Sequence, residues 1–257
     1  MLQVLLSRWQ QGYRTMAWPD GEAVVPDRLR GRPALRPESC QSGCDRCRGV
    51  CPTGAVLGTG GDLAIDLGRC LFCGECQNVC PAGAIAFTNE FRLAVSRRED
   101  LIVRGGSASY RLAAPLPAPA LDLFHRSCKI RQVSAGGCNA CEADINVLGT
   151  LAFDLGRFGL QVVASPRHAD AVAVTGPVPH QMRLALEKTV AATPTPRVVI
   201  AIGSCAIAGG PFAGHPQVND GAGKVAPADL FIPGCPPHPL TILDGLLRLI
   251  GRMPAGR

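Results

Sequence analysis

Thirteen cysteines are the residues of this chain with the greatest potential for chemistry. Eight of them lie between Cys40 and Cys80, and five lie in the second half of the 257 residues. The count is odd, and the opening MLQVLLSRWQQG has none of the features of an export signal. We therefore expect a cytoplasmic protein, in which structural disulfides are rare. Dense cysteine in a reducing compartment indicates metal binding.

The first eight cysteines form a repeat. CQSGCDRCRGVCPTGAV begins at Cys40, and CLFCGECQNVCPAGAI begins at Cys70. The last three cysteines of the first copy recur 29 residues later in the second. Each copy is a C-x2-C-x2-C-x3-C-P run, except that the first copy opens with three residues between its first two cysteines. A period near 30 residues indicates the duplication of one small unit.

This spacing is typical of bacterial ferredoxins, in which the fourth cysteine of each run binds the other cluster. It predicts two 4Fe–4S clusters, one bound by Cys40, Cys44, Cys47 and Cys80 and the other by Cys51, Cys70, Cys73 and Cys76. Two zinc sites of four thiolates each are the alternative. Zinc sites usually use two separated C-x2-C knuckles, and they do not account for the twin Cys-Pro-x-Gly-Ala endings.

The second half of the chain alternates strand-like and helix-like segments. Strands are expected at 128–135, 160–166, 169–176, 197–205 and 229–235, and helices at 142–159, 180–192 and 239–252. Such alternation predicts a parallel sheet covered on both faces. In these sheets ligands bind outside the carboxyl ends of the strands. The turn 58–62, GTGGD, is expected to close a hairpin between the ferredoxin repeats.

Four more cysteines follow strands of this predicted sheet. We expect a third 4Fe–4S cluster at its carboxyl edge, bound by Cys138, Cys141, Cys205 and Cys235. Glycines at 203, 209, 210 and 234 would let the backbone approach that cluster. Three clusters use twelve thiols, which leaves Cys128 as a core side chain in its strand.

Two carboxylates come directly after Cys141. Glu142 and Asp144 suit the positive N-terminal end of a helix. A proton relay at Glu142 is the functional hypothesis, because a carboxylate beside a cluster could transfer protons while the cluster transfers electrons. His180 and His238 are expected near the same end of the sheet, as surface or helix-capping residues or as side chains at a partner interface.

The remaining segments organise the chain. Residues 105–123, rich in Pro, Ala and Gly, are expected to form a linker or an extended surface connection between a domain at 1–104 and a domain at 124–257. The first 16 residues have a helical apolar spacing, which predicts a helix packed on the domain or a partner, or lying at a membrane interface. No transmembrane segment is expected. The net charge of +6 is mild, and we expect no nucleic-acid partner.

Two families share longer stretches with this chain. YRTMAWPDGEAVVPDRLRGRPAL and FRLAVSRRED, around the cysteine runs, resemble the eight-iron ferredoxin-like subunit of formate hydrogenlyase, hydrogenase-4 and respiratory complex I. GGCNACE, GSCAIAGGPF and GCPPHP are similar to the small subunit of energy-converting nickel–iron hydrogenases and to its relative in complex I. Complex I members typically have the first two cysteines adjacent. The two residues between Cys138 and Cys141 follow the hydrogenase pattern.

The resemblance implies a fusion of two subunits. It implies an α+β ferredoxin-like domain with two 4Fe–4S clusters, followed by an α/β flavodoxin-like parallel-sheet domain. The implied function is electron transfer to or from the nickel–iron site of a partner large subunit. Other implied partners are membrane-embedded antiporter-like subunits and a formate dehydrogenase module, carbon monoxide dehydrogenase or ferredoxin.

The implied location is peripheral, at the cytoplasmic face of the inner membrane. The main alternative is a subunit of a complex I-like quinone or ferredoxin oxidoreductase that lacks nickel. A free-standing three-cluster electron carrier without an obligate partner is a further alternative, as is a zinc-stapled interaction protein.

Overall fold

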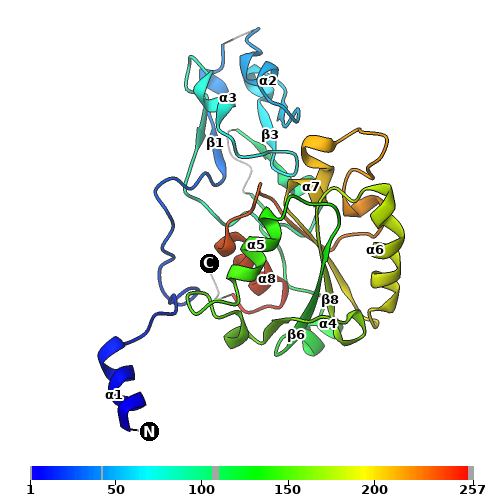
Figure 1. The fold of residues 1–257 in the computed structure, drawn as a ribbon. Coiled ribbons are helices and arrows are strands. Elements are labelled where there is room, and N and C mark those ends of the chain that lie inside the picture. The colour runs from blue at the N-terminus through cyan, green and yellow to red at the C-terminus, as the bar shows by residue number, and fades with distance from the viewer. Residues whose placement is uncertain (1, 42, 106–109, 254–257) are drawn as a thin grey trace.

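The computed structural model describes residues 2–41, 43–105 and 110–253. Figure 1 shows a small lobe that contains the cysteine repeat, lying against a larger lobe built on a parallel sheet. Helix α1 (Leu2–Gln11) stands apart from both lobes. The predicted helix at the start is therefore present, but it does not pack on the domain, because none of its described side chains is buried.

The small lobe consists of two short antiparallel sheets. β1 (Pro33–Leu35) pairs with β4 (Ile85–Phe87), and β3 (Ala64–Asp66) lies between β2 (Val56–Leu57) and β5 (Ile102–Arg104). The predicted turn at 58–62 closes the hairpin between β2 and β3. The short helices α2 (Arg46–Gly49) and α3 (Glu75–Asn78) occupy matching positions of the two cysteine runs. Their bounds differ by the repeat period of 29 residues, so the duplication is visible in the structure.

The large lobe contains a five-stranded parallel sheet. Its strand order is β10 (Leu230–Ile232), β9 (Val198–Ile202), β8 (Ala171–Thr175), β6 (Cys128–Ser134) and β7 (Leu160–Val162). Numbered within this lobe, the order is 2-1-3-4-5 read from β7, which is the flavodoxin-like order. The predicted α/β flavodoxin-like class is confirmed.

Alternate residues of the central strands enter two hydrophobic clusters, one on each face of the sheet. Ala173 and Ile200 pack with helices α5 (Ala140–Val147) and α8 (Pro239–Leu249). Val174 and Val199 pack on the opposite face with α6 (His180–Ala192) and α7 (Ser204–Ala208). That second cluster continues into the core of the cysteine-repeat lobe, so the two lobes share one apolar interior.

One expected helix is shorter than predicted. The sequence predicts a helix over 142–159 that ends at its closing glycine, but α5 ends at Val147 and is followed by turns and a 3-10 helix at Leu155–Phe158. Asp154 has a φ of +47°, a left-handed conformation that a continuous α-helix does not allow. The apolar pattern of this segment therefore reflects a helix followed by a packed turn.

The predicted linker at 105–123 makes specific contacts with both lobes. Residues 106–109 lie outside the described residues. Beyond them, the Tyr110 hydroxyl donates to the Leu93 carbonyl at 2.6 Å, and the Ala113 amide donates to the Ala94 carbonyl at 2.8 Å. The last residues of the segment form helix α4 (Ala118–Phe124). Most of this connection is thus attached to the fold rather than a free spacer.

The segment that follows α1 also joins the two halves. Arg157 donates to the carbonyls of Met16 and Trp18, at 2.8 and 2.6 Å. The buried Trp18 ring packs edge-on against Phe91 with ring centroids 5.1 Å apart. An antiparallel bridge between Val95 and Phe231 adds a direct backbone link. No helix in the described part of the chain is long and apolar enough to cross a membrane.

Candidate iron–sulfur sites

Two cavities in the small lobe are each lined by four cysteines. The first is lined by Cys40, Cys44, Cys47 and Cys80. The second is lined by Cys51, Cys70, Cys73 and Cys76. Each cavity takes three cysteines from one run and the fourth from the other. These are the two sets that the spacing predicted, and the structure brings each of them together.

Backbone amides point at several of these sulfur atoms. The Ala55 amide donates to Cys51 Sγ, and the Ala84 amide donates to Cys80 Sγ, both at 3.2 Å. Gly54 and Gly83, which precede those alanines, share a φ of +61°. This left-handed turn favours glycine, and it aims the next amide at the cysteine. The twin Cys-Pro-x-Gly-Ala endings are therefore turns that supply hydrogen bonds to a thiolate.

Two buried thiols of the second set are difficult to ionise without a bound metal. Burial raises the pKa of Cys70 to about 12, and the neighbouring thiols oppose its ionisation further. Burial and the same neighbours raise the pKa of Cys76 to about 11. Four adjacent thiolates thus need compensating positive charge, which bound iron supplies. The donor set fits a 4Fe–4S cluster.

The third predicted set lies at the carboxyl edge of the parallel sheet. Cys138 follows β6, Cys205 lies in α7 directly after β9, and Cys235 follows β10. Burial raises the pKa of Cys141 to about 12, and the charges of Cys205, Cys235 and Cys138 add to that effect. The geometry agrees: a Cβ at Gly203, two residues before Cys205, would lie 2.6 Å from Cys141 Sγ and 3.5 Å from the carbonyl of Gly234, which precedes Cys235. Residues 97 positions apart in sequence, 138 and 235, thus lie at one edge of the sheet (235 − 138).

Two of the four predicted glycines face ligand sulfurs. A Cβ at Gly203 would lie 2.6 Å from Cys141 Sγ, and a Cβ at Gly210 would lie 2.6 Å from Cys205 Sγ. Both positions have a positive φ, +88° and +55°. The backbone therefore approaches these sulfurs more closely than any side chain would allow. Gly209 and Gly234 instead meet other loop residues.

No group of three or more His, Cys, Asp or Glu side chains within residues 2–41, 43–105 and 110–253 is arranged to bind one metal ion. A 4Fe–4S cluster takes one cysteine at each of its irons, so its ligands stand farther apart than those of a single zinc ion. The thirteenth cysteine, Cys128, is buried in β6 and belongs to the core, as predicted.

A serine that the sequence did not single out joins the second and third cysteine sets. The buried Ser204 hydroxyl lies 2.6 Å from the carbonyl of Cys70 and 3.1 Å from that of Gly234. Gly234 directly precedes Cys235, whose thiol is also influenced by Cys73 of the second set. The lobes thus meet where these two sets approach each other.

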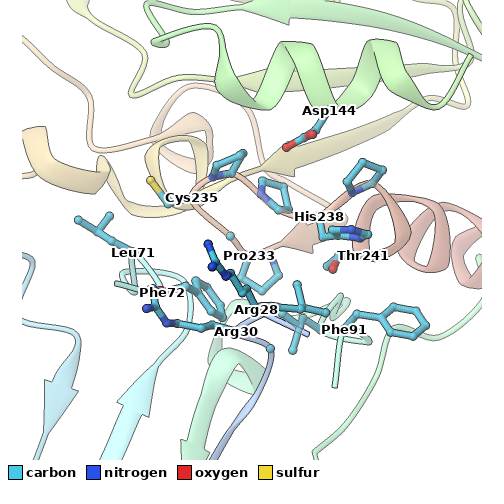
Figure 2. A pocket seen from close by; sticks show the side chains of 17 residues that line it. Arg28, Arg30, Leu71, Phe72, Phe91, Asp144, Pro233, Cys235, His238 and Thr241 are labelled. Carbon is cyan, nitrogen blue, oxygen red and sulfur yellow. Dashed lines mark hydrogen bonds between the residues drawn. The ribbon is translucent and has the colours of Figure 1, made fainter. Parts of the chain in front are cut away.

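A cavity of about 280 Å³ opens beside Cys235, as Figure 2 shows. Arg28 and Arg30 enter it from the N-terminal segment, and Phe72 enters it from the second cysteine run. Asp144 and His238 line the side nearer the sheet. Burial raises the pKa of Asp144 and lowers that of His238.

The predicted histidines have different positions. His238 caps α8, where its Nδ1 accepts the Leu240 amide at 3.2 Å, and it also lines this cavity. His180 is exposed at the first turn of α6, and it does not line the cavity. The helix-capping interpretation is therefore correct for His238.

Glu142 is 5% exposed and points back into the sheet edge. Its Oε1 accepts the hydroxyls of Ser134 at 2.7 Å and Thr175 at 2.6 Å. Burial raises the pKa of Glu142, but these hydrogen bonds outweigh it and leave the pKa below its ordinary value. Ser134 ends β6 and Thr175 ends β8, so Glu142 ties the start of α5 to the point where the strand order reverses.

Comparison with known proteins matches the parallel-sheet lobe and the cysteine repeat to two different families. A family model described as "NADH ubiquinone oxidoreductase, 20 Kd subunit" matches residues 138–249, and one described as "4Fe-4S binding domain" matches residues 63–86. The "Probable membrane-bound hydrogenase subunit mbhJ" of Pyrococcus furiosus is 40% identical over 128 residues, which are 50% of this chain and 77% of that relative. The chain belongs to the 20 Kd subunit family.

Other members of the 20 Kd subunit family include hydrogenase and complex I proteins. "Formate hydrogenlyase subunit 7" of Escherichia coli is 39% identical and covers 54% of either chain. A subunit of the NADH-quinone oxidoreductase of Heliobacterium modesticaldum is 40% identical, over 45% of this chain and 66% of the relative. The predicted relation to hydrogenase and complex I subunits is confirmed, and the chain binds iron–sulfur clusters through its 4Fe–4S region.

Proposed function

We propose that this chain is the electron-transfer subunit of a membrane-associated nickel–iron hydrogenase of the formate hydrogenlyase type. The observation that carries the proposal is the placement of twelve cysteines. Four line each of two cavities in the repeat lobe, and four lie at the carboxyl edge of the parallel sheet, where Ser204 contacts the second set. Bound at these sets, three 4Fe–4S clusters would supply one-electron carriers between an external donor or acceptor and a partner's metal site.

The protein's part in this function is to fix the carriers and their surroundings. The Ser204 hydrogen bond to Cys70 and the shared apolar core hold the second and third cysteine sets in a fixed relative position. Backbone amides donate hydrogen bonds to the sulfur atoms of Cys51, Cys70 and Cys80, and these hydrogen bonds stabilise the thiolate form of the ligands. We assign the ferredoxin-like domain to residues 1–104, the connection to 105–123 and the 20 Kd-type domain to 124–257.

The proposed partners follow from the relatives. The two-residue spacing of Cys138 and Cys141, together with relatives named as hydrogenase subunits, supports a nickel–iron large subunit at the sheet edge. The relatives of membrane-bound hydrogenase and formate hydrogenlyase support membrane-embedded partner subunits. As electron donor or acceptor we propose a formate dehydrogenase module, carbon monoxide dehydrogenase or ferredoxin. We place the chain peripherally at the cytoplasmic face of the inner membrane.

The alternative function rests on the match to the NADH-quinone oxidoreductase relative, and it is not favoured over the hydrogenase function. In that case the chain serves a complex I-like quinone or ferredoxin oxidoreductase without nickel. The two functions differ in the large subunit, which carries two C-x2-C pairs only when it binds nickel and iron.

Glu142 is our proposed proton acceptor at the sheet edge. Its Oε1 is engaged by two hydroxyls, whereas no hydrogen bond to Oε2 comes from the described residues. The hydrogen bonds that lower the pKa of Glu142 hold it ionised and weaken it as a base at neutral pH, so this proposal rests on its position directly after Cys141.

The experiment is purification of the chain with its co-purifying subunits, followed by metal analysis and hydrogen evolution from a low-potential dye. Nickel in the complex and hydrogen evolution that Cys138→Ser abolishes would support the hydrogenase function. A complex without nickel that reduces quinone would overturn it.

A further inference from the structure

An arginine from outside the cysteine repeat lies against the second cysteine set. Arg30 belongs to the N-terminal segment, yet its Nη1 donates to the Phe72 carbonyl at 3.4 Å. A Cβ at Gly74 would lie 3.0 Å from Arg30 Nε. Gly74 directly follows Cys73, so its missing side chain leaves room for the guanidinium beside a ligand of the second set.

The duplication supplies an internal comparison. The repeat period of 29 residues aligns Arg46 of the first run with Glu75 of the second. Arg46 lines the first four-cysteine cavity, and Glu75 lines the second. The two sites therefore carry charges of opposite sign at this position. The first has a cation, and the second has a carboxylate.

Arg30 restores a positive charge at the second site. The same alignment matches Gly74 with Asp45, so the first run has a side chain where the second leaves space for the guanidinium. The Arg30 side chain also lines the cavity beside Cys235, which places it where the second and third sets approach each other.

We propose that Arg30 raises the reduction potential of the cluster bound by Cys51, Cys70, Cys73 and Cys76, supplying there the positive charge that Arg46 supplies at the first cluster. This inference rests on the proposed function. Reduction adds one electron, and hence one negative charge, so a nearby cation stabilises the reduced form. Net charge and solvent exposure are among the factors that set the potential of iron–sulfur clusters.

Arg30 is therefore a tuning residue that binds neither substrate nor iron. Its side chain is exposed, so solvent and salt screen its charge, and the effect will be larger at low ionic strength. Without Arg30, Glu75 would leave the second cluster more difficult to reduce than the first, which would hinder electron flow between the repeat lobe and the sheet edge.

The test is a redox titration followed by electron paramagnetic resonance on the full chain, purified anaerobically with the subunits that accompany it. Cys47→Ser and Cys76→Ser assign the signals of the first and second clusters. Arg30→Gln is expected to lower the potential of the second cluster and to leave the first unchanged. Arg46→Gln is expected to lower the potential of the first cluster and to leave the second unchanged.

Two further variants separate charge from structure. Arg30→Lys keeps the charge and should retain most of the original potential. Arg104→Gln removes another exposed arginine, on β5, and should move neither cluster.

The inference is overturned if Arg30→Gln leaves the second potential unchanged, or if it moves both clusters equally. Since only the two repeat-lobe clusters are read out, the test remains decisive even if the sheet-edge cysteines were found to bind no iron. That separate result, about eight irons per chain in place of about twelve, would instead contradict the proposed function.

Discussion

Replacing Gly210 with alanine should remove the third cluster and spare the other two. Gly210 is buried, and its φ is +55°. An added Cβ would lie 2.6 Å from Cys205 Sγ and 3.2 Å from Cys205 Cα. The added methyl group would therefore overlap the sulfur atom of Cys205, a proposed ligand five residues earlier in the chain.

The size of the effect can be worked out from these distances. Ordinary contacts of a Cβ begin at 3.4 Å, so relief of the overlap needs a displacement of about 0.8 Å (3.4 − 2.6). Metal–ligand distances tolerate only about 0.2 Å of change. Cys205 Sγ can escape by rotating away, but it then no longer points at the cluster. The left-handed backbone adds about 1–2 kcal/mol of strain for alanine.

Gly214→Ala is the matched control. Gly214 also has a positive φ, +79°, but a Cβ there would meet no atom within 4 Å. It therefore carries a similar backbone strain without contact to a ligand. Iron and acid-labile sulfide analysis should give about eight irons per chain for Gly210→Ala and about twelve for Gly214→Ala. A third cluster signal that survives Gly210→Ala unchanged would refute this reasoning.

Three other variants test separate parts of the account. Glu142→Gln should keep all clusters and slow hydrogen evolution about a hundredfold, because the amide cannot accept a proton. Hydrogen evolution at the wild-type rate would show that Glu142 has only a structural role. Asp244→Ala should lower the free energy of unfolding by about 3 kcal/mol, measured by anaerobic urea denaturation, because it breaks the buried ion pair with Arg248. A loss below about 1 kcal/mol would show that this ion pair contributes little to stability. Cys128→Ala should retain about twelve irons, and loss of a cluster would show that the ligand sets are wrongly assigned.

The cysteine sets of the small lobe were accessible from sequence because their ligands are local. Two runs of fixed spacing, 29 residues apart, determine which thiols share a cavity. The sheet-edge set was accessible for a different reason. Parallel strands end at one edge, so residues that follow β6, β9 and β10 are brought together whatever their separation in sequence.

Contacts between the lobes could not be predicted in this way. Ser204 reaches a carbonyl 134 residues earlier, and Arg30 reaches one 42 residues later. Neither contact follows a period or a motif, because each depends on how two separately patterned units pack. The contacts of the segment 105–123 could not be predicted for a similar reason, because its composition allows a linker or an extended surface connection and does not indicate which residues of either lobe it contacts.

Helix α1 shows a third kind of limit. Its apolar spacing correctly predicted a helix, but all its described side chains are at least partly exposed. The apolar side of α1 is therefore a surface that no other described residue buries. A partner subunit or a membrane interface remains our proposal for it.

Counting iron and acid-labile sulfide in anaerobically purified protein, together with low-temperature electron paramagnetic resonance, tests the central claim most directly. Three 4Fe–4S clusters predict about twelve irons and twelve sulfides per chain, with three reducible signals. Cys138→Ser should disturb one of those signals and leave the other two. About eight irons in the wild-type protein, or zinc in place of iron, would contradict the account.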